Sequence, residues 1–570
     1  MSQPLRVGNA SGFYGDRFSA VREMLEGGPL DVLTGDYLAE LTMLILGRGK
    51  MKDPDAGYAA TFLRQMEESL GLAAERGTAI VANAGGLNPR GLADRLRELA
   101  ARLGIDVRVA HVEGDDLLPR AKELGLADAR RGQPLTANAY LGAWGIAECL
   151  RAGADVVVTG RVTDASLVVG PAAAHFGWAR DDWDALAGAT VAGHVLECGA
   201  QATGGNYAFF QEIYNVKAPG FPIAEIHPDG SSVITKHDGT GGAATVGTVT
   251  AQLLYEIGAP SYAGPDVTAR FDTIALEQDG PDRVRISGVQ GVPPPPSTKV
   301  CLNHLGGHRN EMTFVLTGLD IEAKAELAKA QLEAAFAEAR PARVEWTLIG
   351  APGPDPATQG EAAALLRCAV LDPDPEKVGR AFSGAVVELA LAGYPGFTMT
   401  SPPGKGGPYG VYTPAYVPNE AIEHVAVTHE GERIAVPAAP VVRDLHISAE
   451  SPPAGDVPPG ATVRAPLGRV AGARSGDKGG DANIGVWART DAQWRWLEPF
   501  LTTERLRALL PETREHTVHR HVLPNLRAVN FVVEGLLQEG VSASTRFDPQ
   551  GKALGEWLRS RLVDIPEAVL

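Results

Sequence analysis

Two short polar clusters carry residue types that can perform acid–base chemistry. Asp164 lies in TGRVTDASLVVGP, residues 159–171, and Glu197 and Cys198 lie in GHVLECGAQATGGN, residues 193–206. Carboxyl groups and a thiol can donate and accept protons during a reaction. We therefore predict that Asp164, Glu197 and Cys198 are catalytic. A capped helix followed by a glycine-rich turn is the structural alternative for the same segments.

Further polar residues and glycines gather in short loops, many of which follow predicted strands. Loops of this kind can present side chains and backbone amides to a ligand. Asp36 is equally well interpreted as a helix cap, and Thr240 with Gly241 as part of a plain tight turn. We predict that the following residues bind substrate: Ser11, Asp16, Asp36, Asn83, Gly85, Gly86, Arg161, Ser166, Gln201, Thr203, Gly204, Asn206, Thr240, Gly241, Arg474 and Lys478.

The segment RSGDKGGDANIGV supplies the last two of these residues, Arg474 and Lys478. Cationic side chains on a glycine-rich backbone are suited to a phosphate or a carboxylate. Asp477 and Asp481 in the same segment allow a self-paired turn instead. We predict that residues 474–483 form a loop that contacts either a ligand or a neighbouring domain.

Neither a metal site nor a nucleotide site is predicted. His304, His308 and Glu311 have a suggestive spacing, but two intervening glycines argue against a helical ligand face, and a solvated or capping cluster is the preferred interpretation. The glycines of GNASGFYGD, residues 8–16, have the spacing GxxxGxxG, which is a weak nucleotide pattern without a Walker lysine. A pocket wall lined by backbone amides suits that loop better.

The predicted elements bring several of these loops to one edge of a sheet. Short apolar runs at residues 5–7, 30–33, 79–82, 107–111 and 154–158 are typical of buried strands, and helical patterns separate them, including one at 138–152. This order favours a doubly wound, mostly parallel sheet. The carboxyl ends of such strands border the ligand crevice, so the loops that follow these strands are expected to converge.

The rest of the chain divides by pattern into further regions. We predict a doubly wound α/β region over residues 1–210, a mixed α/β region of the same core over 211–440, a proline-rich linker over 441–466, and a compact α+β domain over 467–570. Within these regions we expect strands at residues 268–276, 312–316 and 528–533, among others, and a helix at 321–339.

Composition excludes several classes of function. The formal charge of −17 opposes binding to nucleic acids and to anionic membranes. The cysteines Cys149, Cys198, Cys301 and Cys368 are far apart in the sequence, which indicates free thiols in a reducing compartment. No apolar signal region or apolar run of membrane-spanning length is present, and we expect a cytoplasmic location.

The chain resembles the acyclic terpene utilisation (AtuA-type) family. The resemblance rests on the two catalytic segments above, on GNASGFYGD, on LTGDYLAELTM at residues 33–43 and on RSGDKGGDANIGV. It extends over nearly the whole length and implies a ferredoxin-like fold for the C-terminal domain. The family name implies a place in the breakdown of terpenoids such as citronellol and geraniol.

The resemblance implies chemistry on a branched acyl-CoA thioester. In that route, carboxylation of geranyl-CoA is followed by water addition to a glutaconyl-type ester and by carbon–carbon cleavage, so a hydratase or a lyase is expected. Coenzyme A would then be part of the substrate, with no separate cofactor, and a homo-oligomer is expected. Two alternatives stay open: a non-catalytic auxiliary or scaffold subunit in an acyl-CoA carboxylase pathway, and a phosphate-ester hydrolase.

Overall fold

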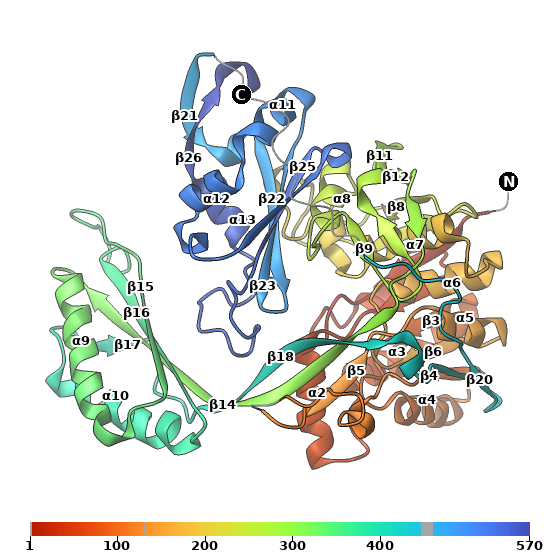
Figure 1. The fold of residues 1–570 in the computed structure, drawn as a ribbon, viewed down its shortest axis with the longest axis horizontal. Helices are drawn as coiled ribbons and strands as arrows, with labels where there is room; N and C mark the ends of the chain where they lie inside the picture. Colours follow the sequence, from red (N-terminus) through yellow and green to blue (C-terminus); the bar gives the residue numbers. More distant parts are fainter. Residues whose placement is uncertain (1–2, 129–130, 446–459) are drawn as a thin grey trace.

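A large mixed sheet forms the body of the protein. The computed structural model describes residues 3–128, 131–445 and 460–570. The five central strands, β1, β2, β3, β6 and β4, run parallel, and antiparallel strands extend the sheet at both edges (Figure 1). The strand order across the sheet is β11 (Ala275–Gln278), β12 (Val284–Ser287), β8 (Ser232–Lys236), β7 (Pro222–Ile226), β1 (Leu5–Asn9), β2 (Val32–Gly35), β3 (Ala79–Ala82), β6 (Val156–Thr159), β4 (Val109–Glu113), β19 (Val425–Val427) and β20 (Arg433–Ala435).

Helices cover both faces of this sheet, as a doubly wound fold requires. Successive residues of a strand point to opposite faces, so Ile80 and Val158 pack in one core while their neighbours Val81 and Val157 pack in the other. The first core is covered by α1 (Ala20–Gly27), α3 (Ala60–Arg76) and α4 (Pro89–Leu103), and the second by α5 (Trp144–Arg151), α6 (Ser166–Phe176), α7 (Trp183–Leu196) and α8 (Val246–Leu253). The doubly wound, mostly parallel sheet predicted for the N-terminal region is therefore confirmed in the five central strands, and the antiparallel strands at its edges make the whole sheet mixed.

A long strand carries a separate lobe away from the body. β14 (Ser297–Thr317) pairs in the body with β5 (Thr136–Ala139) and β18 (Gly407–Pro418), and its far half pairs with β16. We call residues 309–407 the distal lobe, which lies at the left of Figure 1. Its other elements are α9 (Ile321–Phe336), β15 (Arg343–Ile349), β16 (Ala363–Asp372), α10 (Phe382–Ala392) and β17 (Thr398–Met399), and the two helices pack on its sheet.

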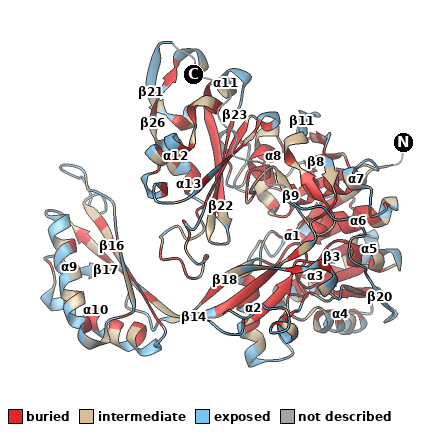
Figure 2. Cartoon of the chain, viewed as in Figure 1, coloured by how far each residue is buried: buried red, intermediate tan, exposed pale blue. Residues whose placement is uncertain are grey.

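The C-terminal domain is built on a four-stranded antiparallel sheet. Strands β22 and β23 are buried along most of their length, whereas the outer side of α9 in the distal lobe is exposed (Figure 2). The domain contains β21 (Thr462–Pro466), β22 (Ala471–Lys478), β23 (Asp481–Ala488), α11 (Asp491–Phe500), α12 (Thr503–Leu509), β24 (Val518–Leu523), β25 (Ala528–Val533), α13 (Leu554–Ser560) and β26 (Leu562–Pro566). The sheet order is β22-β23-β25-β24.

The structure corrects several predicted elements. Residues 138–139 end strand β5 and α5 begins only at Trp144, so the predicted helix at 138–152 was too long at its start. Most of the predicted loop 474–483 belongs to the hairpin of β22 and β23, which turns at Gly479 and Gly480. The predicted strand 268–276 breaks into β10 (Thr268–Arg270) and β11, and β10 belongs to a small sheet with β9 (Ser261–Ala263) and β13 (Gln290–Val292).

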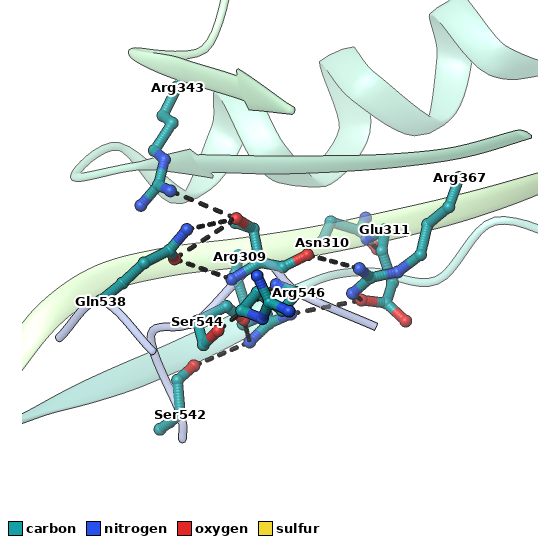
Figure 3. A network of polar contacts seen from close by, with 10 residues as sticks. Arg309, Asn310, Glu311, Arg343, Arg367, Gln538, Ser542, Ser544 and Arg546 are labelled. Atoms are coloured by element: carbon teal, nitrogen blue, oxygen red, sulfur yellow. Dashed lines mark hydrogen bonds and ion pairs between the residues drawn. The ribbon is translucent and has the colours of Figure 1, made fainter. Parts of the chain in front are cut away.

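An arginine network joins the distal lobe to the C-terminal domain (Figure 3). Arg309 Nη1 donates to the carbonyl oxygens of Ser542 (2.8 Å) and Ser544 (3.2 Å), and Arg367 Nη1 donates to the carbonyl oxygen of Thr545 (2.6 Å). Guanidinium groups with several planar donors are suited to such multiple contacts. The network fixes the loop after β25, which borders the cleft described below.

The predicted domain division stays a prediction, since most of its linker, residues 446–459, lies outside the described residues. The regions predicted as 1–210 and 211–440 contribute strands to the same large sheet. Across the described ranges, none of the helices combines the length and the apolar character needed to cross a bilayer.

Candidate functional site

The loops after the parallel strands meet around Asp36. The N–H of Asp36 donates to the carbonyl oxygen of Ser11 (2.9 Å), and its Oδ1 accepts from Asn83 Nδ2 (2.6 Å). The end of β6 lies beside the Asn83–Gly85 loop, because a Cβ atom on Gly85 would lie 2.5 Å from the carbonyl oxygen of Thr159, the last residue of β6. Helix α2 (Glu40–Lys52) begins four residues after Asp36, so the structure does not support the helix-cap interpretation.

Arg161 is the buried cation of this edge. Its Nη1 donates to the carbonyl oxygen of Leu38 (2.9 Å), its Nη2 pairs with Asp164, and its guanidinium carbon lies 4.3 Å from the centroid of the Tyr140 ring. Burial alone would lower the pKa of Arg161, but the Asp164 carboxylate and Tyr140 raise that pKa well above its usual value. The arginine is therefore charged at every physiological pH.

Two carboxyl groups near this ion pair have raised pKa values. Burial, and then the charge of Asp164, raises the pKa of Asp36 and of Glu197 well above the usual range, although Arg161 lowers both. Where neighbouring carboxyl groups cannot all ionise, one can stay protonated and act as a proton donor while another is ionised and can accept a proton. The site therefore contains Asp164, paired with Arg161, beside two carboxyl groups that hold their protons more tightly than usual.

Glu197 and Cys198 follow the C-terminal end of α7. His194 Nδ1 lies 3.2 Å from Glu197 Oε1, and burial lowers the pKa of His194 to about 4, so this imidazole is neutral. Burial, and then the neighbouring charge of Glu197, raises the pKa of Cys198 well above its usual value. Cys198 is thus a thiol rather than a thiolate nucleophile at neutral pH.

Several glycine amides that were candidates for binding an oxyanion already have partners within the chain. The N–H of Gly12 donates to Asp16 Oδ2 (2.8 Å) and the N–H of Gly86 donates to the carbonyl oxygen of Asn83 (3.2 Å). The N–H groups of Gly204 and Gly205 donate to the carbonyl oxygens of Gln201 (3.2 Å) and Ala200 (3.0 Å). A negatively charged oxygen of a ligand would therefore need hydrogen-bond donors other than these amides.

The β22–β23 hairpin of the C-terminal domain closes one side of the site. A Cβ atom on Gly476 would lie 2.3 Å from the Tyr255 ring, so the hairpin backbone packs directly on that residue. Arg474 pairs with Gln201, and its guanidinium carbon lies 4.3 Å from the Tyr255 ring centroid. Lys478 Nζ donates to the carbonyl oxygen of Glu256 (2.9 Å). The hairpin therefore contacts the body of the protein, and its contact with a ligand stays a prediction.

A second polar group lies where α2 meets β14 and β18. Tyr140 Oη donates to Glu40 Oε1 (3.1 Å), and Lys299 Nζ lies 4.8 Å from the Tyr140 ring centroid and 5.6 Å from that of Tyr412. A cleft with an empty volume of about 460 Å³, part of it open to solvent, leads to this group. Its polar lining includes Glu40, Asn303, Tyr412, Asp477, Glu539, Ser542 and Gln550.

The remaining predicted residues lie around the site with mainly structural contacts. Ser166 begins α6 and its hydroxyl contacts that of Thr163 (2.5 Å). Thr203 Oγ1 donates to the carbonyl oxygen of Gly220 (2.6 Å), and Thr240 Oγ1 donates to that of His237 (2.7 Å). Gly241 forms a bridge to Pro219, and Gly204 and Asn206 have φ values of 112° and 56°. Their predicted contacts with substrate stay predictions.

Comparison with models of known protein families shows to which family the chain belongs. The model of the acyclic terpene utilisation family protein AtuA matches residues 5–428, which is most of the chain. The chain belongs to the AtuA family. A second model, the AtuA ferredoxin-like domain, matches residues 465–564 and covers the C-terminal domain. The family and the ferredoxin-like domain predicted from the sequence are thus confirmed. No curated protein matches the chain.

Several residues of this AtuA-family site were missed by sequence reasoning. Glu40 lies in a segment used for the family resemblance, so its acidic type near Asp36 was an available signal. Tyr140, Glu256 and Lys299 stand outside any glycine-rich loop and gave no comparable signal. They converge only through the pairing of β5 with β14 and the docking of the C-terminal domain.

The part of the chain that the structure describes has no cluster of side chains suited to binding a metal ion. There, no group of three or more histidine, cysteine, aspartate or glutamate side chains could hold a metal ion. His304 and His308 lie in strand β14 and do not share a helical face, in line with the glycines between them. All four cysteines are free, as predicted.

Substitution of Gly12 tests the contact between the first loop and the Glu197–Cys198 turn. A Cβ atom on Gly12 would lie 2.7 Å from the carbonyl carbon of Cys198, and that backbone cannot rotate away as a side chain would. We expect Gly12→Ala to lower the free energy of unfolding by about 1–3 kcal/mol, as overpacking does. Urea unfolding measures this, with Gly49→Ala in α2 as control, since its Cβ meets nothing within 4 Å. Equal stability of the two variants would contradict the close contact.

Asp115 gives a pH-dependent prediction. Its Oδ2 accepts from the N–H of Arg161 (2.9 Å) and from Asn138 Nδ2 (2.8 Å), but burial raises the pKa of Asp115 to about 7. A carboxyl whose pKa is higher in the folded state stabilises fully below pH about 4, and this contribution is lost as pH rises through about 7. Relative to wild type, Asp115→Asn should therefore gain stability between pH 5 and pH 7, by at most about 1.4 kcal/mol per pH unit.

Chemical denaturation at pH 5, 6, 7 and 8 measures this effect. Asp155→Asn is the control, because Arg108 lowers the pKa of Asp155 and this carboxylate stays ionised across the range. Its stability difference from wild type should not change with pH. A constant difference for Asp115→Asn as well would show that Asp115 is ionised throughout the range.

Proposed function

We propose that the chain is a hydratase or lyase that acts on a branched acyl-CoA thioester. Its family takes part in acyclic terpene utilisation. The observation that carries the proposal is that Asp164, which pairs with the buried Arg161 at the carboxyl edge of a parallel sheet, lies near Glu197, whose pKa burial and the Asp164 charge raise. Both reactions need a proton acceptor and a proton donor close to each other.

The same two groups serve both reactions. In water addition, Asp164 takes a proton from water, the water oxygen bonds to the β-carbon, and Glu197 gives a proton to the α-carbon. In cleavage of a β-hydroxy thioester, Asp164 takes the hydroxyl proton, the bond between the α- and β-carbons breaks, and Glu197 protonates the α-carbon. The raised pKa of Glu197 keeps that proton available at neutral pH.

Cations around the site favour an anionic substrate. Arg161, Arg474, Lys299 and Lys478 come from different elements and lie close to the acidic groups. Desolvation raises the pKa values of Asp36, Glu197, Glu256 and Asp477, which disfavours their charged forms. A thioester of coenzyme A carries phosphate groups, and the cleft lined by Glu40 and Ser542 offers space for part of an extended substrate.

A direct assay tests the proposal. The purified protein is incubated with branched acyl-CoA esters, including carboxylated unsaturated and β-hydroxylated ones, and products are identified by mass spectrometry. Gain or loss of one water, or release of a shorter thioester, supports the proposal. Release of inorganic phosphate would favour a phosphate-ester hydrolase instead. Absence of any product, together with co-purification with an acyl-CoA carboxylase, would make an auxiliary subunit the better assignment.

A further inference from the structure

A second cleft opens beside the residues that follow strand β5. Its empty volume is about 550 Å³, part of it open to solvent, and its lining shares no residue with that of the cleft near Glu40. The start of helix α5, the turn after β9 and the segment after β20 form parts of its wall, and Arg180 lines it as well. We call it the Arg180 cleft. A cavity of this size can hold a small molecule.

Arg180 brings a cation to this cleft without an ion pair of its own. Its Nη1 donates to the carbonyl oxygen of Pro437 (2.7 Å), and its guanidinium carbon lies 4.9 Å from the centroid of the Trp144 ring. Among the residues that the structure describes, no carboxylate forms an ion pair with Arg180, and its Nε and Nη2 have no hydrogen-bond partner. Burial lowers the pKa of Arg180, although the charge of Asp266 raises it. Because an arginine stays charged in proteins, a cation with unused donors lines the cleft.

Asp266 is the one carboxyl group in the described lining, and it is held by the start of α5. Its Oδ2 accepts from the N–H of Ala143 (2.7 Å), and a Cβ atom on Gly142 would lie 2.2 Å from its Oδ1. Burial raises the pKa of Asp266 to about 6. This carboxyl group therefore packs against the backbone and leaves the donors of Arg180 to another acceptor.

The other polar groups of the lining do not supply that acceptor as an anion. Thr298 Oγ1 donates to Asn419 Oδ1 (2.8 Å), and Asn419 Nδ2 donates to the carbonyl oxygen of Pro295 (2.8 Å). Burial lowers the pKa of His424 to about 3, so its imidazole is neutral. The lining also has an apolar part, which includes Leu141, Pro265, Ile422, Val436 and Ala438.

A carboxylate matches the unused donors of Arg180. Nε and Nη2 of a guanidinium group can bind the two oxygens of a carboxylate side by side. A phosphate dianion fits less well, because its second negative charge would lie near Asp266. We propose that the Arg180 cleft binds a small organic acid, whose carboxylate pairs with Arg180 and whose short hydrocarbon chain contacts the apolar lining. This site is separate from the acid–base site, and the inference does not rest on the proposed function.

A ligand in this cleft would contact the segment that pairs with the loop of Arg161. The N–H of Leu141 donates to the carbonyl oxygen of Arg161 (3.1 Å), and the N–H of Thr163 donates to that of Leu141 (2.9 Å). Leu141 is itself part of the cleft lining. Local opening governs hydrogen exchange, so a ligand that holds residues 140–142 in place should slow the exchange of these two amides.

Titration of the full-length protein with hexanoate, followed by ligand-observed NMR, tests the proposal. We expect saturable binding with a Kd on the order of 1 mM, a value that the ligand efficiencies of small molecules allow. Hexanamide has the same shape without the charge and should bind at least about tenfold more weakly, because the charge-assisted pair is lost. Arg180→Met should weaken hexanoate binding by a similar factor. Arg151→Met is the matched control, because Arg151 also lies over the Trp144 ring, at 5.7 Å, but does not line the cleft.

Hydrogen–deuterium exchange of the wild-type chain locates the ligand without any substitution. Hexanoate should slow exchange in the peptides that contain Leu141, Thr163 and residues 436–439, and the peptide 539–542 beside the other cleft should not change. Hexanamide at the same concentration should give no such protection. This measurement tests the site even if Arg180→Met does not fold.

Weaker binding by folded Arg180→Met and of hexanamide, with protection at the Arg180 cleft, supports the proposal. The absence of saturable hexanoate binding overturns it, and so do an unchanged Kd in Arg180→Met, equal binding of hexanamide, or protection confined to residues 539–542. Inorganic phosphate that displaced hexanoate with a lower Kd would show a phosphate site and overturn the carboxylate class. None of these results bears on the hydratase or lyase assignment, which is decided by turnover of thioesters.

Discussion

Asp164→Asn and Glu197→Gln are each expected to lower kcat by about 10²- to 10⁴-fold, the usual contribution of a positioned acid or base. The amide keeps the size of each side chain but can neither accept the proton from the attacking oxygen nor give one to the α-carbon. Glu197→Gln should affect folding little, because the amide is uncharged and of the same size, whereas Asp164→Asn leaves the buried Arg161 without its ion-pair partner and should also lower the free energy of unfolding. Steady-state kinetics and circular dichroism on the same preparations measure both quantities.

The double variant sharpens this test. If Asp164 and Glu197 act in the same reaction as acceptor and donor, removing both should cost little more than removing either one, as residues that act as a unit are not additive. Glu556→Gln, a surface carboxyl paired with Arg559, serves as control and should have wild-type kcat. Full turnover by either single variant would contradict its assigned role.

The fold was predictable where short apolar runs coincide with buried strands. The predicted strands 79–82 and 528–533 match β3 and β25 residue for residue, because all their side chains except that of Asn530 are apolar and almost all are buried. β14 was largely missed, since its middle section, with His304, Gly306, Gly307 and His308, lacks any alternation of apolar and polar residues. That stretch is defined by its pairing with β18 across a register shift, a long-range feature.

The candidate site was predictable in the part that follows the parallel strands. Asp36, Asn83, Arg161 and Asp164 were chosen because each follows a strand, and the structure brings them together. Lys299 lies within a long strand and Glu256 just past the end of a helix, where a charged residue usually faces solvent. Only the pairing of β14 with β5 and β18 and the packing of the C-terminal domain bring these residues to the site, so local patterns could not identify them.

Arg161→Met should be among the most destabilising substitutions in the body of the protein. The Arg161 side chain is only 3% exposed, and it pairs with Asp164 while donating to the carbonyl oxygen of Leu38. Methionine of similar length would leave that carbonyl and the neighbouring carboxylates without their cation. Breaking a buried ion pair in this way costs about 3–5 kcal/mol, and we expect a loss of that size in the free energy of unfolding at pH 7.

The pH dependence of this loss identifies its cause. Arg161 lowers the pKa values of Asp36, Glu40 and Glu197, so these pKa values should rise in the folded variant. Stability that depends on carboxyl groups with raised pKa values is lost as pH increases, so the deficit of Arg161→Met should be larger at pH 8 than at pH 5.

Two further variants complete the experiment, which is read by urea unfolding at both pH values. Arg161→Lys retains the charge without the planar fork over Tyr140 and should fall between wild type and Arg161→Met. Arg108→Met breaks an exposed ion pair with Asp155 and should lose at most about 1 kcal/mol, with little change in that loss between the two pH values. If Arg161→Met behaved like Arg108→Met, Arg161 would not be the cation that holds the carboxylates of this site together.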